Sequence, residues 1–164
     1  MWSAGCAQGE EAYSLAIIAF ETEITTKTII YATDIDDDAL KKGEKGIYPT
    51  AAFQYTPPEY LEKYFVRHNG DYKIKDNIKL IVKFINLDLF DSFPYGPCDL
   101  IMCRNVLIYM SREAQSELVR KFYENLRPGG YLVIGKVELL LGIPEAKLFN
   151  LVSRTERIYQ KIVV

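Results

Sequence analysis

The stretch that most constrains the fold of this chain is Cys98–Tyr109. It opens as a short apolar run without polar alternation, which is typical of a strand buried on both faces of a parallel sheet. The run stops at Arg104 and Asn105. Ligands of open α/β sheets bind beyond the carboxyl ends of the strands. The stretch therefore predicts a strand that presents Arg104 and Asn105 to a cleft, or, with equal support, a surface ion pair and a turn cap.

The length and charge of the chain exclude several classes of function. Its 164 residues suffice for one domain with a substantial core. The formal net charge is −2, so the charge does not favour binding to nucleic acid or to an anionic membrane. No apolar run approaches the roughly 20 residues of a membrane span, and no signal peptide opens the chain. We therefore expect a soluble globular protein that is not inserted in a membrane.

The cysteine and histidine content indicates the compartment and limits the chemistry. Cys6, Cys98 and Cys103 form an odd set without C-x-x-C spacing, which is typical of reduced thiols in the cytosol. The single histidine, His68, lies in a polar, turn-like stretch. One histidine argues against a multi-histidine metal site and against histidine-based nucleophilic catalysis, so we expect a cytoplasmic protein without a metal centre.

A loop of small residues precedes the first predicted helix, Glu10–Glu21, and contains Gly5 and Gly9. A glycine loop that leads into a helix N-terminus is the layout of a nucleotide-binding turn, although a plain tight turn explains two such glycines more often. Glu10 and Glu11 would repel a pyrophosphate, which disfavours a dinucleotide. The acidic pair suits a ligand that offers hydroxyl groups or positive charge.

A second buried strand, Thr28–Thr33, ends at Asp34, which lies 25 residues past Gly9. An acid at the end of the second strand is the residue that binds ribose hydroxyls in nucleotide-binding sheets. The alternative is that Asp34 or Asp36 caps the predicted helix Asp37–Lys45. Because Asp34 and Asp36 flank a single isoleucine, one of them can bind ribose hydroxyls while the other caps the helix.

The rest of the chain continues the alternation of strands and helices. A third buried strand ends at Asn86, and a proline-glycine-glycine break follows a Ser-capped amphipathic helix. The pattern predicts an α/β fold with a mostly parallel sheet and an antiparallel edge. The predicted elements are a helix at 59–64, a hairpin excursion at about 64–85 with its turn at 69–70, a strand at 80–85, a helix at 111–125, a strand at 131–135, and a closing antiparallel pair at 148–152 and 157–163.

Three strings of the sequence carry a resemblance to a known family. They are W-S-A-G-C-A-Q-G-E-E-A-Y-S at 2–14, A-T-D-I-D at 32–36 and C-R-N-V-L-I-Y at 103–109. Together they resemble the catalytic domain of CheR-type chemotaxis methyltransferases over essentially the whole chain. The resemblance implies one catalytic domain over 1–164 with a Rossmann-like sheet, in which the excursion at about 64–85 is a β-subdomain that faces the receptor.

The resemblance also implies an activity, a cofactor and a partner. Such enzymes transfer a methyl group from S-adenosyl-L-methionine (SAM) to glutamate side chains on the cytoplasmic helices of chemoreceptors, the methyl-accepting chemotaxis proteins, and release S-adenosyl-L-homocysteine (SAH). A glutamate carboxylate is already a nucleophile and a sulfonium is already an electrophile, so positioning and partial desolvation carry the reaction. The resemblance implies that the cofactor is bound by Gly5 in the loop, by Glu11 and Asp34 at its polar groups, with Asp34 on the ribose, by Asn86 and Leu87 beside the adenine, and by Arg104 and Asn105 near the methionine part. It also implies that Arg104 and Tyr109 are catalytic, with Tyr109 near the transferred methyl. No metal is implied.

The chain departs from the family pattern in three respects. Against that pattern we expect a protein that lacks the helical N-terminal domain and its linker and has a first strand reduced to Trp2, and Gly135–Glu138 stands where G-H-S-E is usual. These departures predict a truncated methyltransferase that turns over weakly and associates with a second copy to complete its sheet. One alternative is a catalytically weak module that binds SAM or receptors. Another is an NAD-type oxidoreductase, which the acidic pair Glu10 and Glu11 disfavours.

Overall fold

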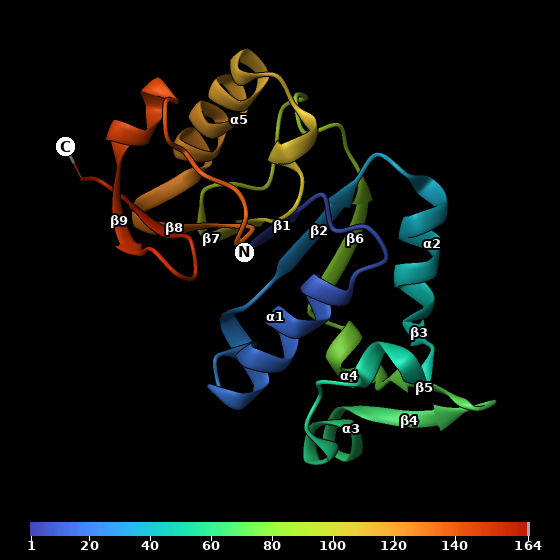
Figure 1. Cartoon of the computed structure of the whole chain (residues 1–164). Helices are drawn as coiled ribbons and strands as arrows, with labels where there is room; N and C mark the ends of the chain where they lie inside the picture. The colour runs from blue at the N-terminus through green and yellow to red at the C-terminus, as the bar shows by residue number, and fades with distance from the viewer. Residues whose placement is uncertain (164) are drawn as a thin grey trace. The chain divides into compact units, whose positions relative to one another are not determined.

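The computed structural model describes residues 1–163 and divides the chain into two compact units (Figure 1). One unit consists of Met1–Gly5 and Leu87–Val164, and the other of Cys6–Asn86. We call them the first and the second unit and describe each by itself. No helix within residues 1–163 has the length and apolar character needed to cross a bilayer.

The first unit contains five strands in the order β1-β7-β8-β10-β9. Strands β1, β7 and β8 run parallel, whereas β10 pairs antiparallel with both β8 and β9. Helix α5 connects β7 to β8 and packs on β8. The elements are β1 (Trp2–Ala4), β7 (Cys98–Cys103), the 3-10 turn η3 (Leu107–Tyr109), α5 (Arg112–Asn125), β8 (Leu126–Ile134), the 3-10 turn η4 (Pro144–Leu148), β9 (Phe149–Ser153) and β10 (Ile158–Lys161).

The start of the chain is more regular than the sequence predicted. Trp2–Ala4 forms a strand rather than a loop, and it pairs with β7 through Trp2↔Ile101 and Ser3↔Met102. The Trp2 side chain is fully buried and stacks on Phe93 with 3.9 Å between ring centroids. Burial of a large aromatic ring is among the strongest apolar contributions to a core, which explains why so short a strand is ordered.

Strand β8 also differs from the prediction, which placed a break at 126–130 and a strand at 131–135. The strand begins at Leu126 and continues to Ile134, with an irregular register opposite Cys98–Leu100. The glycines make this possible. A Cβ on Gly130 would lie 3.0–3.2 Å from three backbone carbonyl oxygens, so only glycine allows the neighbouring backbone to approach this closely.

The second unit contains a parallel pair, β2 and β6, and a small antiparallel sheet in the order β3-β5-β4. Strands β2 and β6 pair from Ile30↔Val82 to Asp34↔Asn86. The elements are α1 (Glu10–Glu21), the 3-10 turn η1 (Thr25–Lys27), β2 (Ile30–Asp34), α2 (Asp37–Lys45), β3 (Ile47–Tyr48), the 3-10 turn η2 (Thr50–Phe53), α3 (Pro58–Tyr64), β4 (Phe65–His68), β5 (Asp71–Ile74), α4 (Asp76–Lys79) and β6 (Val82–Asn86).

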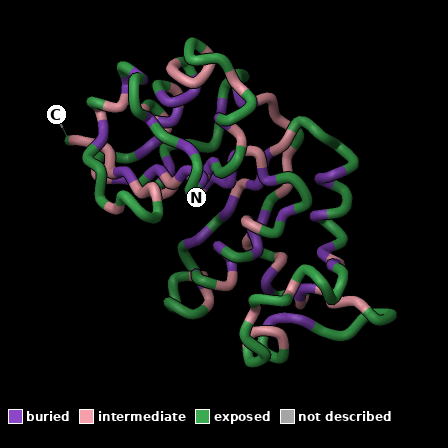
Figure 2. The backbone as a smooth tube through the Cα atoms, in the orientation of Figure 1, coloured by how far each residue is buried: buried purple, intermediate pink, exposed green. Residues whose placement is uncertain are grey.

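The local signals in the sequence explain most elements of the second unit. Helices α1 and α2 have the predicted bounds, and α2 ends at Gly46, whose φ of +65° suits glycine. The predicted turn joins β4 to β5 through Asn69 and Gly70, both with positive φ. The tip of this hairpin is exposed (Figure 2). The prediction missed the two-residue strand β3, which completes the small sheet, and the short helix α4, which lies where strands were expected.

Taken unit by unit, the strands confirm the predicted α/β class. The pairings of β1, β7 and β8, and of β2 and β6, are parallel, and the chain closes with an antiparallel hairpin. Parallel strands connected by helices place the strands' carboxyl ends at one edge, where ligands of such sheets bind. In the second unit the predicted site residues Asp34 and Asn86 end β2 and β6, and in the first unit Arg104 and Asn105 follow β7.

Candidate functional site

The carboxylate of Asp34 is held in place by backbone groups of the second unit. Asp34 is the last residue of β2, and its Oδ2 accepts a hydrogen bond from the N–H of Ala7 at 2.8 Å. Its Oδ1 accepts one from the N–H of Asp36 at 3.0 Å. The Cys6 N–H donates to the Thr33 carbonyl at 2.9 Å, which ties the glycine loop to the same strand. A half-buried carboxylate fixed in this way retains lone pairs for a ligand's hydroxyl groups.

The structure resolves the two tasks that the sequence left to Asp34 and Asp36. The Asp36 side chain caps α2, because its Oδ1 accepts hydrogen bonds from the N–H groups of Asp38 at 2.9 Å and Ala39 at 3.1 Å. Asp34 makes no cap hydrogen bond to α2 in the described residues. Asp34 is therefore the acid that remains for a ligand.

Glycine is required at both predicted loop positions. Gly9 has a φ of +86°, and a Cβ there would lie 2.6 Å from the ring of Phe84. Gly5, in the first unit, has a φ of +73°, and its Cβ would lie 2.6 Å from Val106. Both the left-handed backbone and the lack of space exclude a larger side chain. The glycine spacing thus reflects the path of the backbone, which the sequence alone could not separate from an ordinary tight turn.

Asn86 stands opposite Asp34 at the end of β6, and its amide supports the neighbouring turn. Its Nδ2 donates to the carbonyl oxygen of Ile35 at 3.0 Å and to Oδ1 of Asp37 at 2.7 Å. Both N–H donors of the amide are therefore occupied, and the Oδ1 acceptor remains for a ligand. Glu11 lies half-buried in the first turn of α1, and Leu87, in the first unit, is half-buried directly after β6.

Arg104 and Asn105 follow β7 in the first unit and are both exposed. Asn105 has a φ of +60°, an uncommon conformation that asparagine tolerates better than most residues. Tyr109 ends the 3-10 turn η3 and is 84% exposed. These predicted residues therefore occupy one solvent-facing segment after the strand.

A residue that the sequence did not single out for the site, Glu138, supports this segment. Its side chain is buried, and its carboxylate accepts backbone hydrogen bonds from Asn105 at 3.0 Å, from Ile108 at 3.4 Å and from Gly135. A Cβ on Gly135 would lie 2.6–2.9 Å from Asn105 and Glu138 atoms, so the glycine is needed for this approach. The only signal in the sequence was the glutamate in the Gly135–Glu138 string.

The environment of Cys6 makes its thiol unreactive. Burial, followed by the negative charge of Asp34, raises the pKa of Cys6 to about 12. All three cysteines are buried and free. A neutral thiol is neither a nucleophile nor a metal ligand at neutral pH. Within residues 1–163 no group of three or more His, Cys, Asp or Glu side chains is arranged to hold a metal.

The groups of the second unit fit an adenosine ligand better than a phosphate ligand. A strand-end carboxylate, an acidic helix start and a glycine loop gather hydrogen-bond acceptors and negative charge at the ends of β2 and β6. Hydroxyl groups donate to such acceptors, whereas phosphate oxygens require donors or cations. The Cys6–Gly9 loop contains no lysine or arginine.

Comparisons with known proteins agree with this chemistry. Residues 1–158 match the family described as CheR methyltransferase, SAM binding domain. The chain is 37% identical over 153 residues to a chemotaxis protein methyltransferase of Vibrio parahaemolyticus, which covers 88% of this chain and 56% of that protein. It is 35% identical over 147 residues to the chemotaxis protein methyltransferase of Escherichia coli, covering 84% and 51%. The chain thus spans about half the length of these relatives.

Other similarities extend beyond the chemotaxis proteins. A 104.1 kDa protein of Rhodobacter capsulatus is 34% identical over 166 residues, which is 99% of this chain but 17% of that protein. Among solved structures, PKMT2 from Rickettsia typhi in complex with AdoHcy has a TM-score of 0.53 at 19% identity, covering 81% of this chain and 20% of that chain. The methyltransferase SibL has a TM-score of 0.51 at 19% identity, covering 81% and 29%. The structural matches support the fold alone.

Proposed function

This chain belongs to the family of CheR methyltransferase SAM-binding domains, and from that premise we propose that it transfers a methyl group from SAM to glutamate side chains of chemoreceptor cytoplasmic helices. The SAM-binding domain defines the family, so the cofactor is SAM. The names of the relatives support the glutamate substrate and the receptor partner. Because the proposed substrate helices are cytoplasmic, the proposal places the reaction in the cytoplasm.

The observation that carries the cofactor assignment is the fixed carboxylate of Asp34. The N–H groups of Ala7 and Asp36 orient this carboxylate, and the side chain of Asp36, not that of Asp34, caps α2. A carboxylate at this strand end binds ribose hydroxyls. The other proposed contacts are Glu11 on a further polar group of the cofactor, Gly5 in the loop, Asn86 and Leu87 beside the adenine, and Arg104 and Asn105 near the methionine part, with Arg104 and Tyr109 at the reacting atoms.

The proposed chemistry asks the protein for positioning rather than for proton transfer. When bound, SAM supplies an electrophilic methyl group on a sulfonium. The substrate carboxylate is ionised at neutral pH, so no general base is required. Arg104, Asn105 and Tyr109 would orient the reacting groups and exclude water from them, which can supply a large part of the rate.

Methyl transfer from radiolabelled SAM to a chemoreceptor cytoplasmic fragment tests the proposal. We expect label on the receptor that is released as methanol by mild alkali, which distinguishes a glutamate methyl ester from a methylated amine. A receptor fragment whose acceptor glutamates are replaced by alanine is the control. Binding of SAM without transfer would instead indicate the alternative, a module that binds the cofactor or the receptor without turnover.

A further inference from the structure

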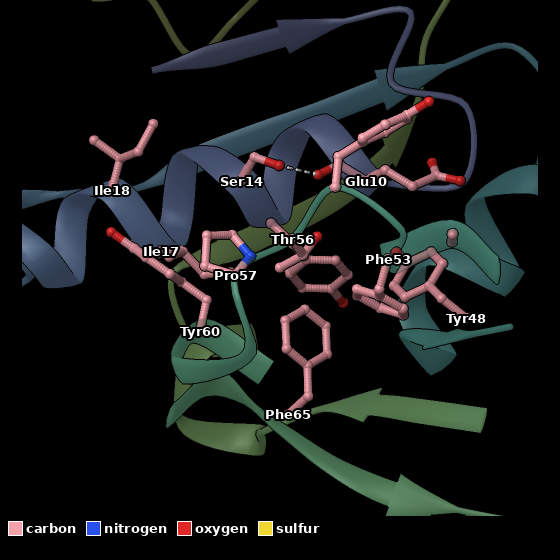
Figure 3. Close-up of a pocket in the computed structure, with 13 residues that line it drawn as sticks. Glu10, Ser14, Ile17, Ile18, Tyr48, Phe53, Thr56, Pro57, Tyr60 and Phe65 are labelled. Carbon is pink, nitrogen blue, oxygen red and sulfur yellow. Dashed lines mark hydrogen bonds between the residues drawn. The ribbon is translucent and has the colours of Figure 1, made fainter. Parts of the chain in front are cut away.

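A cavity of about 500 Å3 lies within the second unit and is formed by α1, β3, η2, α3, β4 and the segment before α3 (Figure 3). Ligand pockets in proteins usually have volumes of roughly 300–1,000 Å3. None of the residues proposed to bind the cofactor lines this cavity. The lining residues are Glu10, Tyr13, Ser14, Ile17, Ile18, Tyr48, Ala52, Phe53, Tyr55, Thr56, Pro57, Tyr60 and Phe65.

Aromatic side chains form a connected wall of this cavity. Tyr13 meets Tyr48 with 6.2 Å between ring centroids, and Tyr48 meets Phe53 at 6.4 Å. Phe53 then meets Phe65 at 4.9 Å, and all three contacts are edge-to-face. Figure 3 shows Tyr48, Phe53 and Phe65 gathered on the side of the cavity opposite α1. Aromatic faces carry a negative quadrupole, so such a wall attracts cations as well as apolar groups.

Three of the six hydroxyl groups that line the cavity donate to backbone partners. The Tyr13 hydroxyl donates to the carbonyl oxygen of Gly43 at 2.8 Å, and the Tyr48 hydroxyl donates to that of Gln8 at 2.7 Å. The Ser14 hydroxyl donates to the Glu10 carbonyl oxygen at 2.8 Å. These hydroxyl protons are therefore not available to a ligand, which meets mainly ring carbons and aliphatic groups.

The charge of the cavity has one sign. Glu10 is the only charged residue among those that line it, and no lysine or arginine joins it. Within residues 1–163 the Glu10 carboxylate forms no ion pair. Burial raises the pKa of Tyr48, and the nearby Tyr13 and then the negative charge of Glu10 raise it further, as expected for a carboxylate beside the aromatic wall.

We propose that this cavity binds an arginine side chain presented by a polypeptide partner. A guanidinium stacks on aromatic faces and forms a bidentate pair with a carboxylate, and its aliphatic stem packs on apolar surface. Aromatic rings beside one free carboxylate supply these partners together. Tyr55 and Ile18 also line the cavity and are 90% and 55% exposed, so they offer apolar area to the residues that flank the arginine.

Peptide binding measured by fluorescence anisotropy tests this inference. The probe is a fluorescein-labelled, capped Ala-Leu-Arg-Leu-Ala peptide, compared with a citrulline peptide that keeps the shape of the side chain without its charge. We expect saturable binding of the arginine peptide and about tenfold weaker binding of the citrulline peptide, because a charge-assisted hydrogen-bond pair contributes on this scale.

Substitutions assign the binding to this cavity. Glu10→Gln should reduce the affinity for the arginine peptide to that for the citrulline peptide, and Phe53→Leu should weaken both. Glu62→Gln is the matched control, because Glu62 is an exposed acid on α3 that does not line the cavity. The affinity of the Glu62→Gln variant for the arginine peptide should match that of the unchanged protein. Far-UV circular dichroism and melting temperature confirm that each variant is folded.

The inference is overturned if both peptides bind equally, since the cavity then accepts apolar chains without regard to charge. It is also overturned if Glu10→Gln leaves the affinity for the arginine peptide unchanged, or if binding fails to saturate at millimolar peptide. None of these results bears on SAM binding, for which other residues are proposed.

Discussion

At the scale of single residues, Asp34 is the position at which the cofactor assignment is most directly tested. We expect Asp34→Ala to weaken SAH binding by about 1–3 kcal/mol, the contribution of hydrogen bonds to a charged acceptor. Isothermal titration calorimetry measures the change. Asp38→Ala is the control, because Asp38 is an exposed acid in α2 that pairs with Lys41. Equal affinities for the Asp34 variant and the unchanged protein would remove the ribose contact from the proposal.

The buried Cys6 thiol predicts how stability depends on pH. Its pKa is raised from 9.0 to about 12, so the folded protein holds this proton more tightly than the unfolded chain does. The resulting stability is complete below pH 9 and is lost as the pH rises toward 12. Urea unfolding at pH 8, 9 and 10 should show a decreasing free energy of unfolding.

Cys6→Ala separates the thiol from other groups that titrate at high pH. Burial also raises the pKa of Tyr13 and Tyr48, so both contribute losses of the same sign. The variant should therefore lose stability less steeply above pH 9 than the unchanged protein does. Parallel pH profiles for the two proteins would show that Cys6 is not a source of the effect.

Single residues also show where the sequence sufficed and where it did not. Asp34 could be predicted because an acid after the second strand is a local signal with a known structural meaning. The choice between Asp34 and Asp36 as the helix cap depends on backbone geometry that a sequence does not contain. Glu138 reaches a backbone N–H group 33 residues earlier, and no local pattern encodes such a contact.

At the scale of elements, the segment after β7 depends on the carboxylate of Glu138. We expect Glu138→Gln to destabilise the protein by about 1–3 kcal/mol, because a glutamine replaces one acceptor oxygen with an amide donor that faces backbone N–H groups. If Arg104 and Asn105 contact the cofactor, SAH affinity should fall as well. Thermal melting and calorimetry measure the two effects.

Two further variants interpret the Glu138 result. Glu156→Gln removes an exposed acid that pairs with Lys136, and it should leave both quantities nearly unchanged. Gly135→Ala perturbs the same segment by crowding Asn105 and Glu138, so it should reproduce both losses. A loss of stability without any change in SAH affinity would limit Glu138 to a role in folding.

The elements themselves were predicted as far as their signals are local. Helices α1 and α2 combine helical periodicity with acidic first turns, and α2 adds an Asp cap and a terminal glycine. The predicted start of β8 was wrong. A Pro-Gly-Gly string usually interrupts a strand, but here it lies close to the backbone of β7 as part of the strand. Strand β3 contains two residues, which is too short for any periodic pattern.

At the scale of the whole molecule, the sequence predicted the fold class and, through its three family strings, the family. The alternation of strands and helices suffices for a mostly parallel sheet. The aromatic cavity of the second unit could not be predicted, because its lining residues come from five elements between positions 10 and 65. Residues brought together over such separations are a property of the folded chain.

The whole molecule also provides a test that separates the methyltransferase from the NAD-type oxidoreductase. A ligand that binds only the folded state stabilises it by about 2.7 kcal/mol at a hundredfold excess over its Kd. For a chain of this size that corresponds to a rise in Tm of roughly 5–10 °C.

We expect this rise with SAH and a markedly smaller one with NAD at the same concentration, because Glu10 and Glu11 at the start of α1 repel a pyrophosphate. Differential scanning calorimetry measures both, and Asp34→Ala should reduce the response to SAH. A larger shift with NAD than with SAH would contradict both the cofactor assignment and the role of the acidic pair.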